Sequence, residues 1–169
     1  MNYKSEKGMT TKSVVIIIFI LILIVCTAIY GLNKMIKEQE SENLKTNMLI
    51  IQAKSKSYCE NAKNKLGASP TDETRESAKE YLNEFGSKYY ESLNLDISKF
   101  NLEDTEYLYL LTTDSFEKMG IDEIQSNEKN GYYFVKFDIE NETVEVFNTK
   151  GFTKDGITYY SVSDINKNS

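Results

Sequence analysis

An uncharged segment near the start of the chain constrains this sequence more than any other feature. No Asp, Glu, Lys or Arg occurs in the 21 residues between Lys12 and Lys34, and most of them are Ile, Val, Leu or Phe. A helix rises about 1.5 Å per residue, so a run of this length covers the roughly 30 Å hydrocarbon core of a bilayer. The segment therefore predicts a transmembrane helix at residues 9–33, with membrane lipid as its partner.

Two other interpretations of the apolar run fit less well. A buried helix of a soluble protein would carry polar residues along one face, and this run has no such face. A cleaved secretory signal peptide has an apolar region of about 7 to 15 residues followed by a small-x-small cleavage site. This run is longer, and the residues that follow Ala28 offer no such site. A retained anchor is favoured.

The orientation of the anchor follows from its flanks. Lysines before and after the run nearly balance, and long domains cross a membrane largely regardless of their charge. We therefore expect a single-pass membrane protein with a cytoplasmic N-terminus and an extracytoplasmic or cell-surface C-terminal domain. The lysines counted are Lys4, Lys7 and Lys12 on one side and Lys34, Lys37 and Lys45 on the other.

Composition after the run argues against several classes of function. Leaving out Lys4, Lys7, Lys12 and Glu6 reduces the 20 basic and 26 acidic residues to 17 and 25, a net charge of −8. Nucleic-acid binding needs a basic surface, so no nucleic-acid partner is expected. The chain has no His, the usual general base and the commonest metal ligand. No catalytic motif, cofactor-binding loop or metal-binding spacing stands out, so we expect no enzyme, cofactor or metal.

One acidic cluster offers an alternative to that expectation. Asp138, Glu140, Asn141 and Glu142 bring oxygen ligands together, and hard cations such as calcium take such ligands. Their spacing matches no EF-hand loop, so a solvated hairpin turn is favoured. The two cysteines cannot form an intramolecular disulfide, because Cys26 lies in the apolar run and Cys59 far along the same predicted helix. Cys59 is expected to be a reduced or buried thiol.

The residues after the apolar run predict an amphipathic helix at 34–66. Neither Gly nor Pro interrupts it, and its apolar residues recur at spacings of three and four. We expect the span to continue into this helix without a break, from about Thr11 to Leu66. Gly67 suits the C-terminal cap, and a second amphipathic helix is predicted for 72–91. Met48, Ile51, Tyr58 and Ala62 are predicted to face a sheet.

Short alternating runs predict an antiparallel sheet in the remainder of the 67–169 domain. A strand is expected at 106–112, followed by a short helix at 114–120 with Asp114 as its cap. Strands at 131–139 and 143–149 read as one hairpin, and Asp155-Gly156 predicts the turn of another. The expected fold is therefore α+β, with the long N-terminal helix, a transmembrane half and an amphipathic half, packed on a small antiparallel β-sheet.

This order of parts, with Gly8 between a short basic leader and the apolar run, resembles type IV pilins and pseudopilins. The resemblance is specifically to the divergent pilin-like proteins of low-GC Gram-positive bacteria, which share a hairpin ending like "VEVFNTKGFTKDGITYYSVSDI" from Val144 to Ile165. The resemblance implies that a prepilin peptidase removes residues 1–8. Its processing site would be Lys7, Gly8 and Met9, with the cut between Gly8 and Met9. Other pilin-like subunits would then be partners, packed through their apolar helices.

One residue departs from the family pattern. Pilins usually carry a glutamate five residues into the mature chain, where it pairs with the terminal amine of a neighbour. Here that assembly position is Ser13, which carries no charge. The resemblance then implies a minor component of a type IV pilus or type II secretion-like filament. The alternative is a simple signal-anchored surface protein with a partner-binding domain, and an extracellular enzyme is a more distant third.

Overall fold

The computed structural model describes residues 11–164. The chain divides into two units, one ending at Gln39 and one beginning at Glu40. Helix α1 (Thr11–Leu66) runs without a break through both, which confirms the predicted continuous helix. Gly67 ends it with a φ of +73°, and the Gly67 amide donates to the Lys63 carbonyl at 3.0 Å. The second unit, called the globular unit below, has the predicted α+β fold.

The inner face of α1 forms one wall of the main core. Its buried side chains recur every three or four residues, as a single helix face requires. They are Leu44, Met48, Ile51, Ser55, Cys59, Ala62 and Leu66. Met48, Ile51 and Ala62 are therefore buried as predicted. Tyr58 is half-buried and instead packs against the next helix, with its ring tilted by 38° to that of Phe85 and the two ring centroids 4.2 Å apart.

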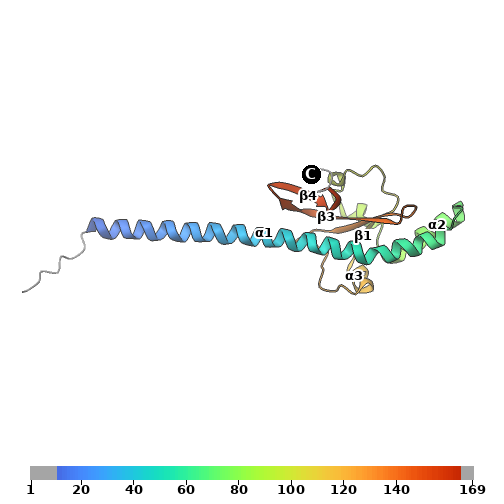
Figure 1. Ribbon diagram of the computed structural model, residues 1–169, viewed down its shortest axis with the longest axis horizontal. Coiled ribbons are helices and arrows are strands. Elements are labelled where there is room, and N and C mark those ends of the chain that lie inside the picture. The colour runs from blue at the N-terminus through green and yellow to red at the C-terminus, as the bar shows by residue number, and fades with distance from the viewer. Residues whose placement is uncertain (1–10, 165–169) are drawn as a thin grey trace, which may run out of the picture. The chain divides into compact units, whose positions relative to one another are not determined.

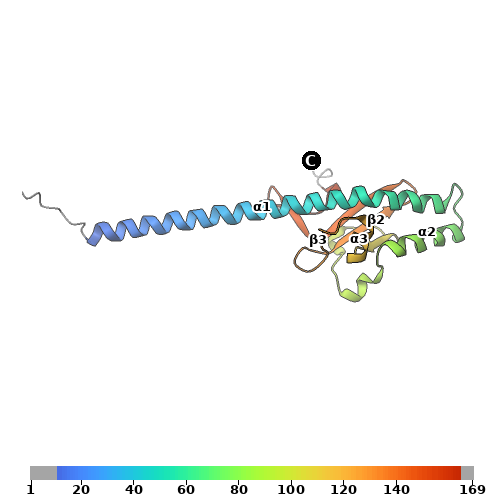
Figure 2. The same cartoon turned by 90° about the horizontal axis from the view of Figure 1, so that it is seen from below.

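Helix α2 (Asp72–Phe85) lies beside the C-terminal part of α1 (Figure 2). Thr71 caps its start, because the Thr71 hydroxyl accepts from the Thr74 amide. In return, the Thr74 hydroxyl accepts from the Thr71 amide, which completes a capping box. The predicted end at residue 91 is wrong. Gly86 adopts an extended conformation, and a Cβ there would lie 2.8 Å from the Tyr109 Cβ. This close approach requires glycine, and the glycine ends the helix.

The chain after Gly86 forms two 3-10 segments, η1 (Tyr89–Leu93) and η2 (Ser98–Phe100). A short helix, α3 (Thr113–Met119), follows the first strand. Its N-cap is Thr112 and not Asp114, because the Thr112 hydroxyl accepts from the Ser115 amide at 3.4 Å. Asp114 instead lies in the first turn and pairs with Lys118 at 2.7 Å.

Four antiparallel strands form the sheet in the order β1-β2-β3-β4 (Figure 1). Both predicted hairpins are present. They share the long strand β3, whose pairing with β4 is interrupted by a bulge between Phe147 and Phe152. The Asp155-Gly156 turn has positive φ at both residues, as a type I′ turn requires. The bounds are β1 (Leu108–Leu110), β2 (Tyr133–Asp138), β3 (Thr143–Lys154) and β4 (Ile157–Ser161).

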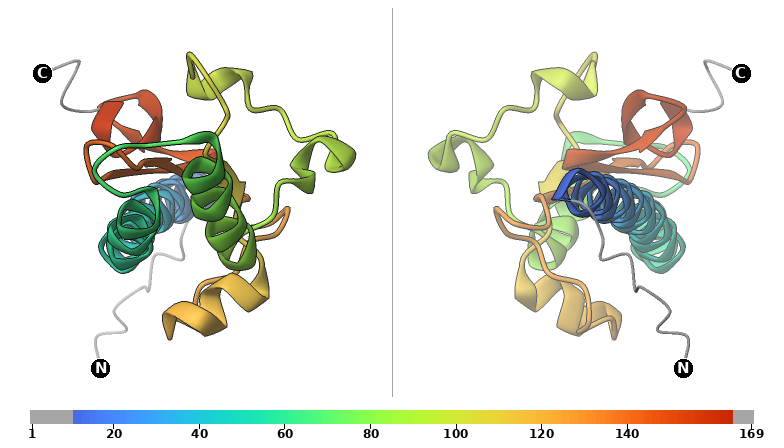
Figure 3. Two further views of the ribbon diagram at one scale, coloured as in Figure 1. Left: turned by 90° about the vertical axis from the view of Figure 1, so that its right-hand side faces the viewer. Right: turned by 90° about the vertical axis from the view of Figure 1, so that its left-hand side faces the viewer.

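Both faces of the sheet are covered. The main core lies between one face of the sheet and the helices α1, α2 and α3, and cross-strand pairs such as Val135 and Val146 contribute to it. Helices α1 and α2 run side by side (Figure 3). A smaller core on the other face packs the η1 and η2 segments against Phe134 and Phe147. Side chains alternate between the two faces along each strand, so one sheet serves both cores.

The far end of β3 extends beyond β2 and meets α1. The Ser41 hydroxyl accepts from the Thr153 amide at 2.8 Å and donates to the Thr153 carbonyl at 2.8 Å. One side chain thus satisfies both backbone groups of an unpaired strand edge. Lys150 adds an ion pair with Glu40 at 3.8 Å. These contacts fix the β3-β4 hairpin to the first turn of α1 in the globular unit.

Candidate functional site

The first unit presents apolar side chains on every side of α1. Its large apolar residues from Ile18 to Ile36 are each between 50% and 76% exposed. By length and composition this helix can cross a membrane, with a mean hydropathy of 2.1 over its most apolar window and none of that window buried. A helix that is apolar all round needs lipid or other apolar helices to cover it.

The free energy available to such a segment is large. The segment from Val14 to Leu32 contains fourteen Leu, Ile, Val and Phe residues, both ends included. At about 0.3 to 0.6 kcal/mol each, they favour insertion into a bilayer by about 4 to 8 kcal/mol. The polar Thr27 side chain adds little cost, because its hydroxyl donates to the Ile24 carbonyl at 2.9 Å. The segment therefore suits a hydrocarbon environment along its length.

Polar and aromatic groups mark the end of the apolar segment. Tyr30 is 76% exposed, and tyrosine prefers the interface between membrane and water. One turn later, Lys34 pairs with Glu38 along the helix at 3.8 Å. The change from apolar to charged residues thus falls within about two turns of helix, between Tyr30 and Glu38.

The residues predicted for processing and assembly are placed only in part. Lys7, Gly8 and Met9 lie outside the residues that the structure describes. Ser13, the residue predicted for assembly, lies in the first turn of α1.

The acidic cluster weighed as a calcium site is a hairpin turn. The Asp138 carboxylate accepts from the Asn141 amide at 3.0 Å and from the Asn141 side-chain amide at 2.7 Å. These bonds hold the pKa of Asp138 below its ordinary value, because they stabilise the charged form. Among residues 11–164, no group of three His, Cys, Asp or Glu is arranged to hold a metal ion. The Asp138 carboxylate therefore orders the turn between β2 and β3.

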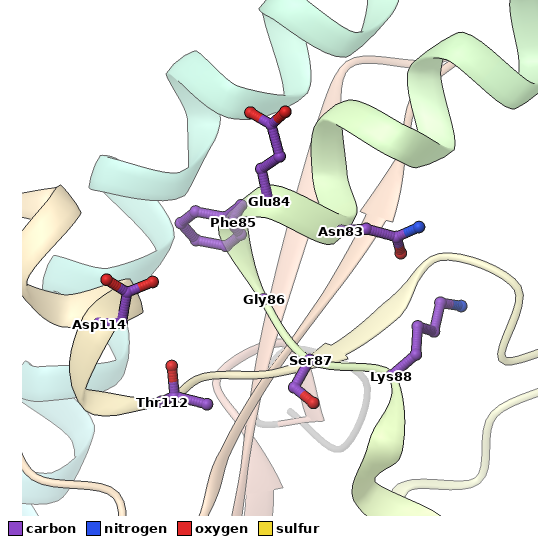
Figure 4. A pocket seen from close by; sticks show the side chains of 8 residues that line it. All are labelled: Asn83, Glu84, Phe85, Gly86, Ser87, Lys88, Thr112 and Asp114. Carbon is purple, nitrogen blue, oxygen red and sulfur yellow. The ribbon is translucent and has the colours of Figure 1, made fainter.

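A surface hollow of about 480 Å³ lies where α2 ends and α3 begins (Figure 4). Asp114 lies on one side of the Gly86-Ser87 segment and Lys88 on the other. Two of its charged groups are engaged. The Asp114 carboxylate pairs with Lys118 at 2.7 Å, and the Lys88 ammonium donates to the Thr105 carbonyl at 3.1 Å and to the Glu106 carbonyl. The full lining is Asn83, Glu84, Phe85, Gly86, Ser87, Lys88, Thr112 and Asp114.

Lys88 has a structural role at the edge of this hollow. Its ammonium lies 4.7 Å from the centre of the Tyr109 ring, a cation–π distance. Burial lowers the pKa of Lys88, because removing water penalises the charged form. Its contacts tie the segment after α2 to the 105–106 loop. The Lys88 ammonium is therefore held by backbone carbonyls at the edge of the hollow.

The Cys59 thiol is fully buried under the β2-β3 turn. Its sulfur lies 3.5 Å from the Asp138 carbonyl and 3.6 Å from the Thr143 carbonyl, both suitable acceptors. Burial, with Asp138 nearby, raises the pKa of Cys59 to about 11. A protonated, enclosed thiol is a poor nucleophile and cannot reach a second chain. The expected buried, reduced cysteine is present.

Comparisons with models of known protein families, with curated proteins and with solved structures find no match. The functional argument therefore depends on the helix and on the surfaces of the globular unit.

Proposed function

We propose that this protein is a non-enzymatic, pilin-like membrane subunit, a minor component of a type IV pilus or type II secretion-like filament. The observation that carries the proposal is the single helix α1. Its first part is apolar on every side, and its last part forms a wall of the α+β core. A chain built this way can hold its globular unit beside a membrane or a bundle of apolar helices.

The proposed orientation places the N-terminus in the cytoplasm and the globular unit outside. Cleavage between Gly8 and Met9 would remove a leader that contains three of the charged residues of the N-terminus, Lys4, Glu6 and Lys7. The mature chain would start at Met9, three residues before Lys12. Removal of the charged leader favours lateral movement of the helix from lipid into a neighbouring set of apolar helices.

The Ser13 position supports a minor role within such a filament. In a major subunit, a glutamate at this position would neutralise the terminal amine of a neighbour. Ser13 offers only a hydroxyl, so an amine buried beside it would stay unpaired at a cost of several kcal/mol. Lys12 adds a second positive charge close by. The terminal amine and the Lys12 ammonium are stabilised more easily at a membrane surface or at the end of a filament, where water and lipid headgroups solvate them.

The two-part helix α1 also supports a second candidate, a signal-anchored single-pass surface protein whose globular unit binds a partner. That function needs no cleavage after Gly8 and no charge at Ser13. The two candidates differ in where the protein is found. A pilin-like subunit should be released with filaments sheared from cells, whereas a simple anchor should stay in the membrane fraction.

The test is therefore fractionation of cells that carry the intact chain, with the protein detected by an antibody to its globular unit. Co-purification with sheared filaments supports the pilin-like role. Complete retention in membranes, under conditions where filaments are recovered, would refute it and favour the second candidate.

A further inference from the structure

A long loop covers the outer face of the sheet, which is the face opposite the main core. Residues 88–106, called the strap below (yellow-green in Figure 3), leave the sheet at Ser87 and return to it at Tyr107. The backbones of Ser87 and Leu110 exchange two hydrogen bonds of 2.9 Å, and the Tyr107 carbonyl accepts from the Phe137 amide at 3.1 Å. Both ends of the strap are therefore fixed beside strand β1.

Between these ends the strap is attached to the sheet through side chains. The backbone hydrogen bonds that the structure describes for residues 88–104 stay within the strap. Phe100, for example, donates to the Ile97 carbonyl at 3.0 Å, and Asn101 donates to the Ser98 carbonyl at 3.2 Å. Neighbouring strands are joined by a regular ladder of backbone bonds. The strap is not held by such a ladder, so fewer bonds have to break for it to leave the sheet.

The strap and the outer face of the sheet share the smaller core. The Phe100 ring centroid lies 4.8 Å from that of Phe147 and 5.5 Å from that of Phe134, and the Tyr90 ring centroid lies 5.4 Å from that of Phe134. Among the described residues, none from α1, α2 or α3 belongs to this core. The strap contributes Tyr90, Leu95, Ile97, Phe100 and Leu102. The smaller core can therefore be lost while the helices keep their packing.

Contacts within the strap hold it together as a loop. The Lys88 ammonium, at the start of the strap, donates to the Thr105 carbonyl at 3.1 Å and to the Glu106 carbonyl at its end. The Asp96 carboxylate accepts from the Ser98 hydroxyl at 2.6 Å and so orders the turn before η2. Because these bonds join residues of the strap to each other, they persist when the strap leaves the sheet.

Two lysines fasten the strap to the sheet. Lys136 of β2 donates to the Asp104 carbonyl at 2.9 Å and to the Asp104 carboxylate at 2.8 Å. Lys99 of the strap donates to the Thr149 carbonyl of β3 at 2.9 Å. Opening must break these bonds together with the aromatic contacts of the smaller core, whereas the pairing of β1 with β2 and of β2 with β3 stays intact.

We propose that the strap opens and closes as one unit while the main core stays folded. Regions with few buried apolar contacts open at a lower free energy than the whole domain, often as contiguous cooperative units. Opening uncovers an apolar strip on the outer face of the sheet, made of Leu108, Leu110, Phe134 and Phe147. This inference goes beyond the proposed function, because it concerns the globular unit alone and does not depend on cleavage or on filament assembly.

Thiol labelling of the full chain in detergent micelles tests the opening. In a chain with Cys26 replaced by serine, Leu108→Cys places a thiol under the strap, and Cys59 is the reference thiol in the main core. Both positions are 0% exposed. In the absence of urea, the thiol at position 108 should be labelled roughly a hundredfold faster than Cys59, because it needs only the strap to open. Equal labelling rates at the two sites, read from their separate peptides, would overturn the proposal.

Two further variants of this chain separate strap opening from unfolding. Ile51→Val weakens the main core alone, so it should speed labelling of Cys59 about fivefold and leave position 108 unchanged. Lys136→Met keeps an apolar stem but removes both bonds to Asp104. It favours the open and the unfolded states equally over the closed state, so labelling should speed up roughly tenfold at both sites. If Ile51→Val speeds both sites alike, the strap opens only when the main core unfolds, and the proposal is wrong.

Hydrogen exchange gives the same test without a substitution in the smaller core. In the Cys26→Ser chain, the Phe100 and Asn101 amides should share one opening free energy, clearly below that of the α1 amides around Ile51. Exchange of the strap amides with the same opening free energy as α1 would overturn the proposal.

Discussion

Two adjacent isoleucines on α1 give a sharp test of how the helix packs on the sheet. Ile51 is 0% exposed and belongs to the main core, whereas Ile50 is 40% exposed on the outer face. Replacing either by Ala removes the same three carbon atoms. The substitutions differ only in what surrounds those atoms, so the pair isolates the effect of burial.

The magnitudes follow from the burial. Three carbons at about 0.8 kcal/mol each give a loss of about 2.4 kcal/mol when they leave a fully buried site. The cavity left at Ile51 adds to this, so Ile51→Ala should lower the free energy of unfolding by about 3 to 4 kcal/mol. At Ile50 part of the side chain already contacts water, no cavity forms, and alanine is the better helix former. Ile50→Ala should therefore cost about 1 kcal/mol or less.

The assay is urea unfolding of the full chain in detergent micelles at a protein concentration low enough to prevent self-association. Tyrosine signals report the globular unit, because 10 of the 12 tyrosines follow Glu40 and the chain has no tryptophan. The transition for Ile51→Ala should move to clearly lower urea, while that for Ile50→Ala stays near the parent. Equal shifts for the two variants would refute the assignment of the buried face.

Three further changes test individual contacts. Tyr109→Phe should leave stability unchanged or raise it by about 1 kcal/mol, because the buried Tyr109 hydroxyl has no hydrogen-bond partner among the described residues; a loss measured by urea unfolding would contradict this. Ser41→Ala should speed amide exchange at Thr153 and cost about 1 kcal/mol, whereas Ser57→Ala should leave Thr153 protected. With Cys26 replaced by serine, Cys59 should resist thiol reagents at pH 8 until the protein unfolds, and labelling in the folded state would contradict this. Stability should also fall between pH 9 and about 11, because the Cys59 thiol ionises in the unfolded chain before it reaches its raised pKa in the folded protein.

Sequence periodicity predicted the helix and the hairpins well, for physical reasons. The absence of Gly and Pro between Lys34 and Leu66 leaves no break in α1, and Asp155-Gly156 specifies a two-residue turn. The end of α2 could not be predicted, because residues 86–91 are compatible with a helix. The helix stops at Gly86 because the chain passes close to Tyr109 on β1, a contact made far along the sequence.

The outer face of α1 shows the same limit of prediction from sequence. The spacing of Leu49, Ile50 and the neighbouring lysines is visible in the sequence, but a helical pattern alone does not tell which face is inside. The buried set had to be known before Leu49 and Ile50 could be recognised as exposed. The role of Asp138 in its turn was likewise hidden, since carboxylates at this spacing suit either a cation or a hydrogen-bonded hairpin.

The identity of the first residue in protein extracted from membranes tests the central claim most directly. Intact mass and terminal peptide mapping would give it without any assumption about the partner. We predict a chain that begins at Met9, with a methylated amine, because a pilin-like subunit loses its leader before assembly. A chain that retains residues 1–8 in every molecule would contradict the pilin-like role and leave α1 as a plain membrane anchor.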